Sequence, residues 1–168
     1  STFHLPDING AIMITGSHNP PEYNGFKISV GKDTIFGPAI QELKEIILSE
    51  EFQKGSGESY SYDIFPEYIR KHKSEFGDLS SVKVVLDCGN GAAGCVARAL
   101  YEACGLKPIV LFENPDGTFP NHHTDPTVEK NLQALIAKVK ESGAHLGIGF
   151  DGDCDRIGVV DSNGEVLP

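Results

Sequence analysis

The chain has 168 residues, of which 39% are hydrophobic and 23% charged, so we expect a packed core rather than wholesale disorder. Its formal net charge of −10 at pH 7 disfavours general nucleic-acid binding, because such a surface repels phosphate polymers. No apolar run is long enough to span a bilayer, and the four cysteines contain no C-x-x-C pair. The sequence therefore predicts a cytoplasmic protein with reduced thiols, no membrane contact and no nucleic-acid partner.

The first third of the sequence alternates short apolar segments with polar loops. We expect an apolar strand at residues 11–14, a loop rich in Gly, Pro, Asn and Ser at 15–25, and a strand of alternating apolar and polar residues at 26–30. A helix is expected from Gly37-Pro38 onward, with proline at its first position. Polar residues 54–61 are the best candidate for a linker, and an amphipathic helix is expected over 65–76. Because the opening strand needs neighbours to bury both faces, we expect the chain to be cut from a longer protein.

From Val82 onward the pattern becomes a regular β-α-β-α-β alternation. The expected strands are residues 82–87, 108–112, 145–150 and 157–160. A helix is expected to follow the Gly89–Gly94 turn, and a second helix to begin at Asp125-Pro126 and end at Gly143. This order predicts a three-layer α/β/α domain with a mostly parallel sheet, preceded by a truncated α/β domain. Ligands of such sheets gather beyond the carboxyl ends of the strands.

The strongest chemical signal is an acidic triplet, Asp151, Asp153 and Asp155, directly after an apolar strand. In a near-extended chain alternate side chains share a side, and three converging carboxylates repel one another unless a cation lies between them. Oxygen ligands favour Mg²⁺, Mn²⁺ or Ca²⁺ over zinc, and the spacing does not fit an EF-hand. The alternative is a solvated acidic turn. Arg156, next in sequence, either donates two hydrogen bonds to a phosphate or is a structural ion-pair partner.

A second signal is the loop that contains Ser17, which also follows an apolar strand. The nucleophile-elbow pattern fails, since Asn19 stands where the second glycine is required. Ser17 either reacts or simply caps a turn. Lys27 lies ten residues later on the next expected strand, and a hairpin would bring it back toward this loop.

A third signal is the string Gly89–Gly94, which matches G-x-G-x-x-G between a strand and a helix. Glu113 ends the next strand, where a dinucleotide-binding fold has the acidic residue that binds the ribose hydroxyl. An NAD(P)-type binding module is therefore the alternative function, and a tight structural turn is the alternative interpretation. The adjacent histidines His122 and His123 diverge too much to share a metal, so we expect their loop to cap the following helix.

Together these motifs resemble the α-D-phosphohexomutase family, and within it most closely the bacterial phosphomannomutases/phosphoglucomutases. The matching segments, in the family's order, are T-G-S-H-N-P-P-E-Y-N-G-F-K at 15–27, D-C-G-N-G-A-A-G at 87–94, P-D-G-T-F-P-N-H-H-T-D-P at 115–126 and D-G-D-C-D-R at 151–156. Family members have four domains around a cleft. The resemblance implies that residues 1–60 are the latter part of domain 1, that residues 61–168 are domain 2, and that the remaining domains are missing.

The resemblance also implies a role for each matched residue. Ser17 would carry the transferable phosphoryl group, and Lys27 would transfer a proton near the reacting hydroxyl, with His18 beside Ser17 in the catalytic loop. Arg156 and Asn19 would hold phosphate. One Mg²⁺ would be bound by the Ser17 phosphate and the three aspartates: Asp151, Asp153 and Asp155.

The implied reaction moves a phosphoryl group between the 1- and 6-positions of mannose or glucose phosphate, with glucose or mannose 1,6-bisphosphate as activator. The expected partners are the hexose phosphate and the missing domains, with a possible dimer through the truncated first domain. The chain alone is expected to be inactive, because the sugar-recognition domains are absent. Cys154 stands where the family most often has glycine, and it would add strain if the position requires a positive φ.

Overall fold

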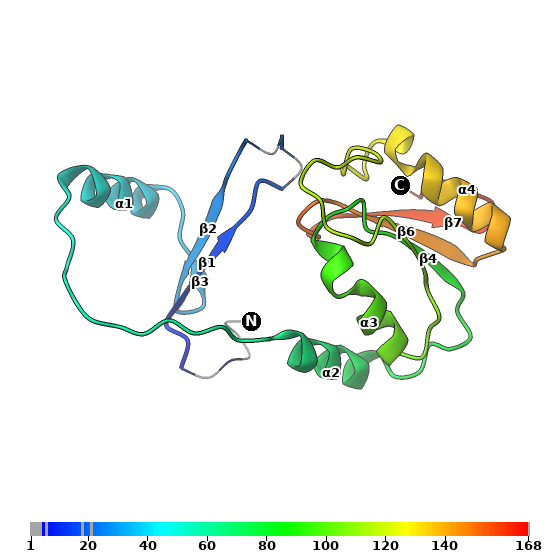
Figure 1. Cartoon of the computed structure of the whole chain (residues 1–168), viewed down its shortest axis with the longest axis horizontal. Coiled ribbons are helices and arrows are strands. Elements are labelled where there is room, and N and C mark those ends of the chain that lie inside the picture. The colour runs from blue at the N-terminus through cyan, green and yellow to red at the C-terminus, as the bar shows by residue number, and fades with distance from the viewer. Residues whose placement is uncertain (1–4, 6, 18, 21, 168) are drawn as a thin grey trace. The chain divides into compact units, whose positions relative to one another are not determined.

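The computed structural model describes residues 5, 7–17, 19–20 and 22–167 (Figure 1). The chain divides into two compact units, and each is treated by itself: Ser1–Thr15 with Asn24–Ile64, and Gly16–Tyr23 with Phe65–Pro168. Nowhere in the described part of the chain is there a helix that is both long and apolar enough to cross a membrane.

The first unit contains a small antiparallel sheet and one helix. Strands β1 (Gly10–Ile14) and β2 (Phe26–Val30) form the expected hairpin, and β3 (Asp33–Thr34) pairs with the end of β2. Helix α1 (Pro38–Ser49) begins with the expected proline, whose fixed φ and missing N–H suit the first turn. Residues 51–64 form neither helix nor strand, as expected for a linker. The two-residue strand β3 is too short to leave a pattern in the sequence.

The second unit is built on a four-stranded sheet in the order β5-β4-β6-β7. Its strands are β4 (Val84–Asp87), β5 (Ile109–Leu111), β6 (Leu146–Phe150) and β7 (Ile157–Asp161). Both β5 and β6 run parallel to β4, whereas β7 pairs antiparallel with β6. The predicted mostly parallel sheet is confirmed.

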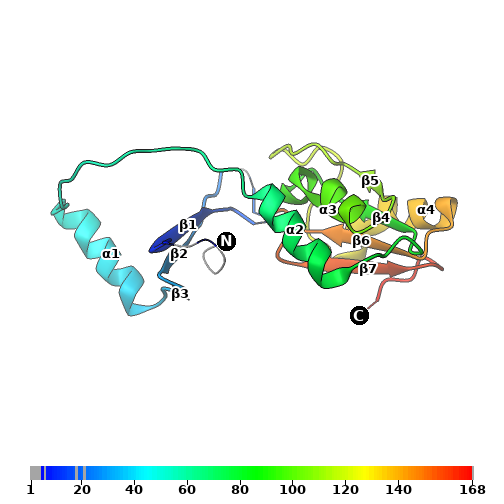
Figure 2. The ribbon, with the colours of Figure 1, turned by 90° about the horizontal axis from the view of Figure 1, so that it is seen from below.

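Helices cover both faces of this sheet, so that the predicted three layers are confirmed (Figures 1 and 2). The helical segments are α2 (Phe65–Phe76), a 3₁₀ turn (Ala92–Cys95), α3 (Ala97–Ala103), a second 3₁₀ turn (Glu129–Leu132) and α4 (Gln133–Ser142). Val84 and Leu86 of β4 pack toward α3, and Val85 packs toward α4. Because β4 is buried on both faces, its first three residues are apolar without alternation, and it ends in the buried Asp87.

The helix expected to begin at Asp125-Pro126 begins later, and that prediction was wrong by several residues. The Asp125 carboxylate accepts hydrogen bonds from the N–H and the hydroxyl of Thr127, at 3.1 and 2.7 Å, which closes a local turn instead of capping a helix. Val128 is extended, and α4 starts only after the 3₁₀ turn. Its predicted end at Gly143 is confirmed, with the left-handed φ of 62° that glycine tolerates best.

Candidate functional site

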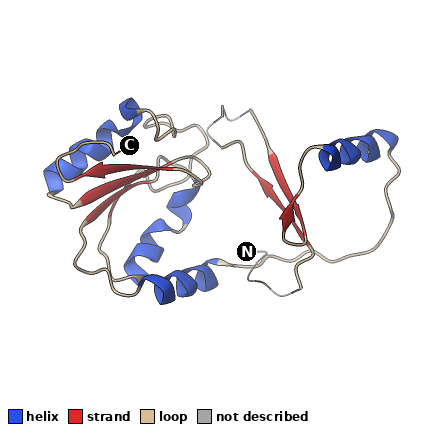
Figure 3. Cartoon of the chain, turned by 180° about the vertical axis from the view of Figure 1, so that it is seen from behind, coloured by secondary structure: helices blue, strands red, loops and turns tan. Residues whose placement is uncertain are grey.

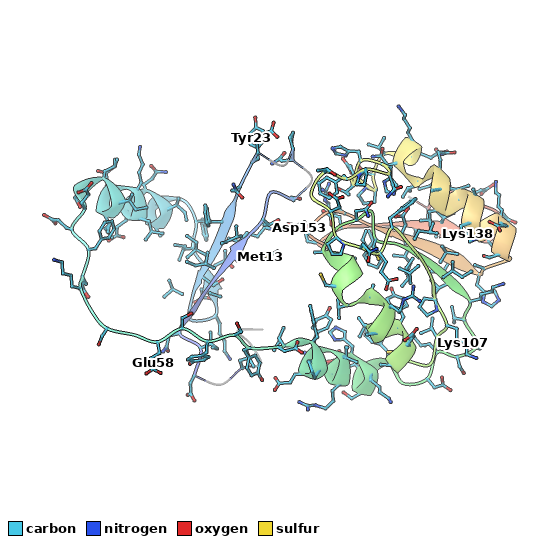
Figure 4. The ribbon with its side chains drawn as sticks, viewed as in Figure 1. Met13, Tyr23, Glu58, Lys107, Lys138 and Asp153 are labelled. Carbon is cyan, nitrogen blue, oxygen red and sulfur yellow. The ribbon has the colours of Figure 1, made fainter. Side chains whose placement is uncertain are left out.

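The candidate site lies where β4 and β6 end side by side in the second unit. Because the two strands are parallel neighbours, their carboxyl ends meet at one edge of the sheet. The Ala92 N–H donates to the Gly152 carbonyl at 2.9 Å, which joins the loop after β4 to the loop after β6. Asp153 and Lys107 lie at opposite ends of this sheet (Figure 4). Figure 3 shows loops that extend beyond these strand ends. The buried strand β4 supports them from below.

The acidic triplet converges as predicted, but through a turn and not through the near-extended chain that was expected: the Cys154 N–H donates to the Asp151 carbonyl at 3.2 Å. One carboxylate oxygen from each of Asp151, Asp153 and Asp155 lies within 4.8 Å of the others. Asp151 is fully buried, and its Oδ1 accepts the backbone N–H groups of Asp155 and Arg156 at 2.9 and 3.1 Å. These bonds fix the loop around the innermost carboxylate.

Arg156 compensates part of the negative charge of the cluster. Its Nε donates to Asp151 Oδ2 at 3.0 Å and lies 3.8 Å from Asp155, while its Nη1 lies 3.6 Å from Asp125. The residue thus serves as an ion-pair partner in this structure, one of the two roles considered for it. The guanidinium reduces the repulsion among the carboxylates, which a divalent cation would reduce further.

The donor set fits a hard divalent cation. A carboxylate oxygen has two lone pairs, so Asp151 Oδ2 keeps one for a cation beside its bond to Arg156. The three ligand atoms are oxygens, which Mg²⁺ prefers, and Asp155 is exposed enough to leave room for water or phosphate. The hydroxyl of buried Thr124 has no hydrogen-bond partner among the described residues and lies beside the same loop.

The Ser17 loop belongs to the same unit and packs against the acidic loop. A Cβ placed on Gly152 would collide with the Ser17 carbonyl oxygen and lie 3.3 Å from its carbonyl carbon, so only glycine allows this approach. Ser17 adopts a φ of 53°, which costs a non-glycine residue about 1–2 kcal/mol. The Asn19 N–H donates to Gly16 O at 2.9 Å, which tightens the turn around Ser17. The structure therefore brings together Ser17, Asn19 and the acidic loop.

Two predicted site residues cannot be placed relative to this arrangement. His18 lies outside the described residues. Lys27 pairs with Met13 across the β1–β2 hairpin, as expected for a hairpin, but it belongs to the other unit, so the structure assigns it no distance to the acidic triplet. Their proposed roles rest on the sequence motif.

Cys154 adopts a φ of 67°, which is the strained case considered for a non-glycine residue in this loop. Desolvation raises the pKa of its thiol, and the carboxylates of Asp151, Asp153 and Asp155 raise it further. The thiol is therefore neutral and a weak ligand, because a thiolate is the form that binds metals.

Sequence reasoning missed a buried pair between Asp87 and His122. The His122 Nε2 lies 3.0 and 3.1 Å from the two Asp87 oxygens, and its Nδ1 lies 2.9 Å from the His123 carbonyl oxygen. Both ring nitrogens face acceptors, an arrangement that favours the ring with a proton on each nitrogen. The hydrogen bond to Asp87 is the main cause of its raised pKa, against an opposing contribution from burial. The available signal was an aspartate at the end of a buried strand.

Family comparison matches both units. A model described as "Phosphoglucomutase/phosphomannomutase, alpha/beta/alpha domain II" matches residues 64–164, and the corresponding domain I model matches residues 2–54. The chain belongs to the phosphoglucomutase/phosphomannomutase family. The predicted family resemblance is confirmed.

Relatives of this phosphoglucomutase/phosphomannomutase family member carry the names of the same family. The chain is 47% identical to a phosphomannomutase/phosphoglucomutase of Pseudomonas aeruginosa over 93% of its own length, and 46% identical to a phosphoglucomutase of Neisseria meningitidis serogroup B over 93%. It spans 34% of each relative. A crystal structure of a family protein from Burkholderia thailandensis superposes with a TM-score of 0.89 at 43% identity, covering 95% of this chain and 35% of that one.

In this phosphoglucomutase/phosphomannomutase family member the Gly89–Gly94 string forms a close-packed turn. A Cβ on Gly91 would lie 3.1 Å from the Cα of Gly152, and one on Gly94 would collide with the Glu113 carbonyl. The Glu113 carboxylate, which the dinucleotide interpretation needed for a ribose, binds Arg98 through two hydrogen bonds at 2.7 and 2.6 Å. These contacts favour the structural interpretation of the glycines.

Proposed function

We propose that this chain carries the phosphoryl-transfer site of a phosphosugar mutase, which moves a phosphoryl group between the 1- and 6-hydroxyls of mannose or glucose phosphate. The observation that supports this proposal most is that the Ser17 loop packs on Gly152, the residue between Asp151 and Asp153 of the acidic triplet. A transferable phosphoryl group and a cation site are the two parts that such a reaction needs side by side.

In the proposed mechanism Ser17 Oγ holds the phosphoryl group and exchanges it with a sugar hydroxyl. As the bond from the sugar oxygen to phosphorus forms, the bond from phosphorus to Ser17 Oγ breaks. Lys27, in its uncharged form, takes the proton of the sugar hydroxyl, and the departing Ser17 oxygen takes up a proton from water to become a hydroxyl again. Asn19 and Arg156 hold the phosphoryl oxygens. Mg²⁺ held by Asp151, Asp153 and Asp155 would stabilise the negative charge on those oxygens.

The remaining parts of the proposal follow from the family and concern the whole protein. Because the chain spans about a third of its relatives, we infer that other domains recognise the sugar and that this chain alone is inactive. The division into residues 1–60 and 61–168 stays a prediction. So do the 1,6-bisphosphate activator, a dimer through the first unit, the support of the phosphate by His18 in the serine loop and the cytoplasmic location.

Phosphorylation of Ser17 tests the first part of the proposal. After the whole mutase, with the sugar-recognising domains inferred above, is incubated with glucose 1,6-bisphosphate, intact-mass measurement should show one added phosphoryl group, and peptide mapping should place it on Ser17. Ser17→Ala should lose the added mass, whereas Ser162→Ala, in an exposed turn far along the sequence, should keep it. Phosphate on another residue, or none at all, contradicts the proposal.

Magnesium titration tests the second part. Asp153→Asn should weaken Mg²⁺ binding by at least about tenfold in calorimetry, because it removes one charged ligand and leaves the fold intact. Asp33→Asn, an equal charge change on exposed β3, is the matched control and should bind as the wild type does. Equal Mg²⁺ affinity of the wild type and Asp153→Asn would contradict the proposal that the acidic triplet binds a cation.

A further inference from the structure

The side chain of Thr124 is an exception to the rule that buried polar groups are hydrogen-bonded. The residue is 1% exposed, and its Oγ1 has no hydrogen-bond partner within the described part of the chain. A buried hydroxyl without a partner costs about 1–3 kcal/mol, and a valine of the same shape would avoid that cost. A hydroxyl at this position therefore needs a physical reason.

The position of Thr124 supplies that reason. Its methyl carbon lies 3.1 Å from the Cβ position of Gly89, in the loop after β4, and its hydroxyl lies 3.2 Å from the Cβ position of Gly152. The apolar end of the side chain thus faces one loop, and the polar end faces the acidic loop. Gly152 stands between Asp151 and Asp153 and also touches the backbone of Ser17. The hydroxyl lies where the catalytic loop and the acidic loop meet.

The segment that carries Thr124 is anchored on both sides. Two residues before it, the His122 ring is held by the buried carboxylate of Asp87. The next residue, Asp125, lies 3.6 Å from Arg156, which also binds Asp151. These two ion pairs keep the hydroxyl facing the acidic loop and prevent it from turning to water.

We propose that Thr124 is a positioning residue of the acidic loop, whose hydroxyl gains its missing hydrogen bond when that loop holds a divalent cation. This inference rests on the cation site of the proposed function. The partner is an oxygen acceptor of the loaded loop, either a loop group or a cation-bound water, since Mg²⁺ usually keeps several waters. Hydrogen bonds of this kind, one shell outside the ligands, change metal affinity by about 10–100-fold.

The proposal predicts opposite effects on stability and on cation binding. Thr124→Val keeps the shape and removes the hydroxyl. Without Mg²⁺ the variant should unfold at a higher temperature than the wild type, by about 2–4 °C, because an unpaired buried polar group is gone. Its Mg²⁺ affinity should fall by about tenfold. A merely structural threonine would not separate the two effects in this way.

The experiment measures Mg²⁺ affinity by calorimetry and thermal unfolding by circular dichroism, with and without Mg²⁺, on the full 168-residue chain. Thr124→Ser keeps the hydroxyl and should bind Mg²⁺ within about threefold of the wild type, a difference below 1 kcal/mol. If valine is not accommodated, Thr124→Ala removes the same hydroxyl and should show the same loss of affinity.

Three outcomes separate the possibilities. Wild-type affinity in Thr124→Val, together with weak binding in Asp153→Asn, overturns the role of Thr124 and leaves the cation site intact. Equal losses in Thr124→Ser and Thr124→Val also overturn it, because a variant that keeps the hydroxyl would then bind no better than one that lacks it. Wild-type affinity in Asp153→Asn means that the cation site itself, and with it the proposed function, has failed.

Discussion

The two units of this chain have similar apolar patterns in their strands and helices but bury the apolar side chains to different extents. Every residue of β4 in the second unit is buried, and Val85 and Leu86 are 0% exposed. In the first unit most apolar residues of the hairpin and of α1 stay exposed and none is fully buried: Ile12 is 64% exposed and Ile47 61%. Amphipathic patterning predicts which face of an element is apolar, and only packing partners decide whether that face is covered.

This difference bears on where chemistry is held. In the second unit, helices cover both faces of the sheet, so the loops at its carboxyl edge rest on a close-packed core. The Ser17 loop, although it continues β1 of the first unit in sequence, is part of the second unit. If Ser17 reacts as proposed, its loop is positioned by the better-packed part of the molecule.

The largest expected effect is a contrast between core truncations in the two units. Leu135→Ala removes a 0% exposed side chain from the core beneath α4 and should lower the free energy of unfolding by about 2–5 kcal/mol. Ile47→Ala in α1 should change it by about 0.5 kcal/mol or less, because that side chain is exposed. Urea unfolding followed by circular dichroism measures both. Comparable losses in the two variants would break the contrast.

A smaller effect is expected at the buried pair Asp87–His122, as a function of pH. The folded-state pKa of His122 is raised, so the stability from this pair is fully present below about pH 6.5 and is lost as the pH rises through the folded-state pKa. His122→Asn should therefore cost about 1–2 kcal/mol at pH 5.5 and less at pH 9.

The measurement is the difference in urea unfolding free energy between wild type and His122→Asn at several pH values. Taking the difference cancels groups that titrate equally in both proteins. His72→Asn on α2 is the control, since that ring bonds a backbone carbonyl on its own helix rather than a carboxylate. A loss from His122→Asn that does not vary with pH would show that the ring is not charged in the folded state.

The smallest effect concerns backbone strain in the acidic loop. Cys154→Gly should stabilise the second unit by about 1 kcal/mol, because glycine adopts a φ of 67° without a steric penalty. Glu50→Gly, at a φ of 56° after α1, makes the same exchange in the first unit and should leave the thermal unfolding of the second unit unchanged. A lower melting temperature for Cys154→Gly would mean that the thiol packs usefully.

Much of the local structure follows from features that act within a few residues. Proline at position 38 begins α1, and the left-handed glycine at 143 ends α4. Backbone geometry dictates these outcomes without reference to the rest of the chain. The carboxylates of Asp151, Asp153 and Asp155 also meet, but a turn in their loop brings them together and not the alternation of an extended chain. The start of α4 was a further local failure, since Asp125 closes a turn with Thr127 instead of capping a helix.

The meeting of distant loops depended on the tertiary structure. Ser17 touches Gly152, and His122 binds Asp87, through contacts that span many residues of sequence. Such pairs form because the order of the strands brings particular loop ends to one edge of the sheet, and no short-range pattern encodes that order. For the same reason a threonine that looks like an ordinary loop residue in the sequence becomes a buried hydroxyl beside Gly152 of the acidic loop.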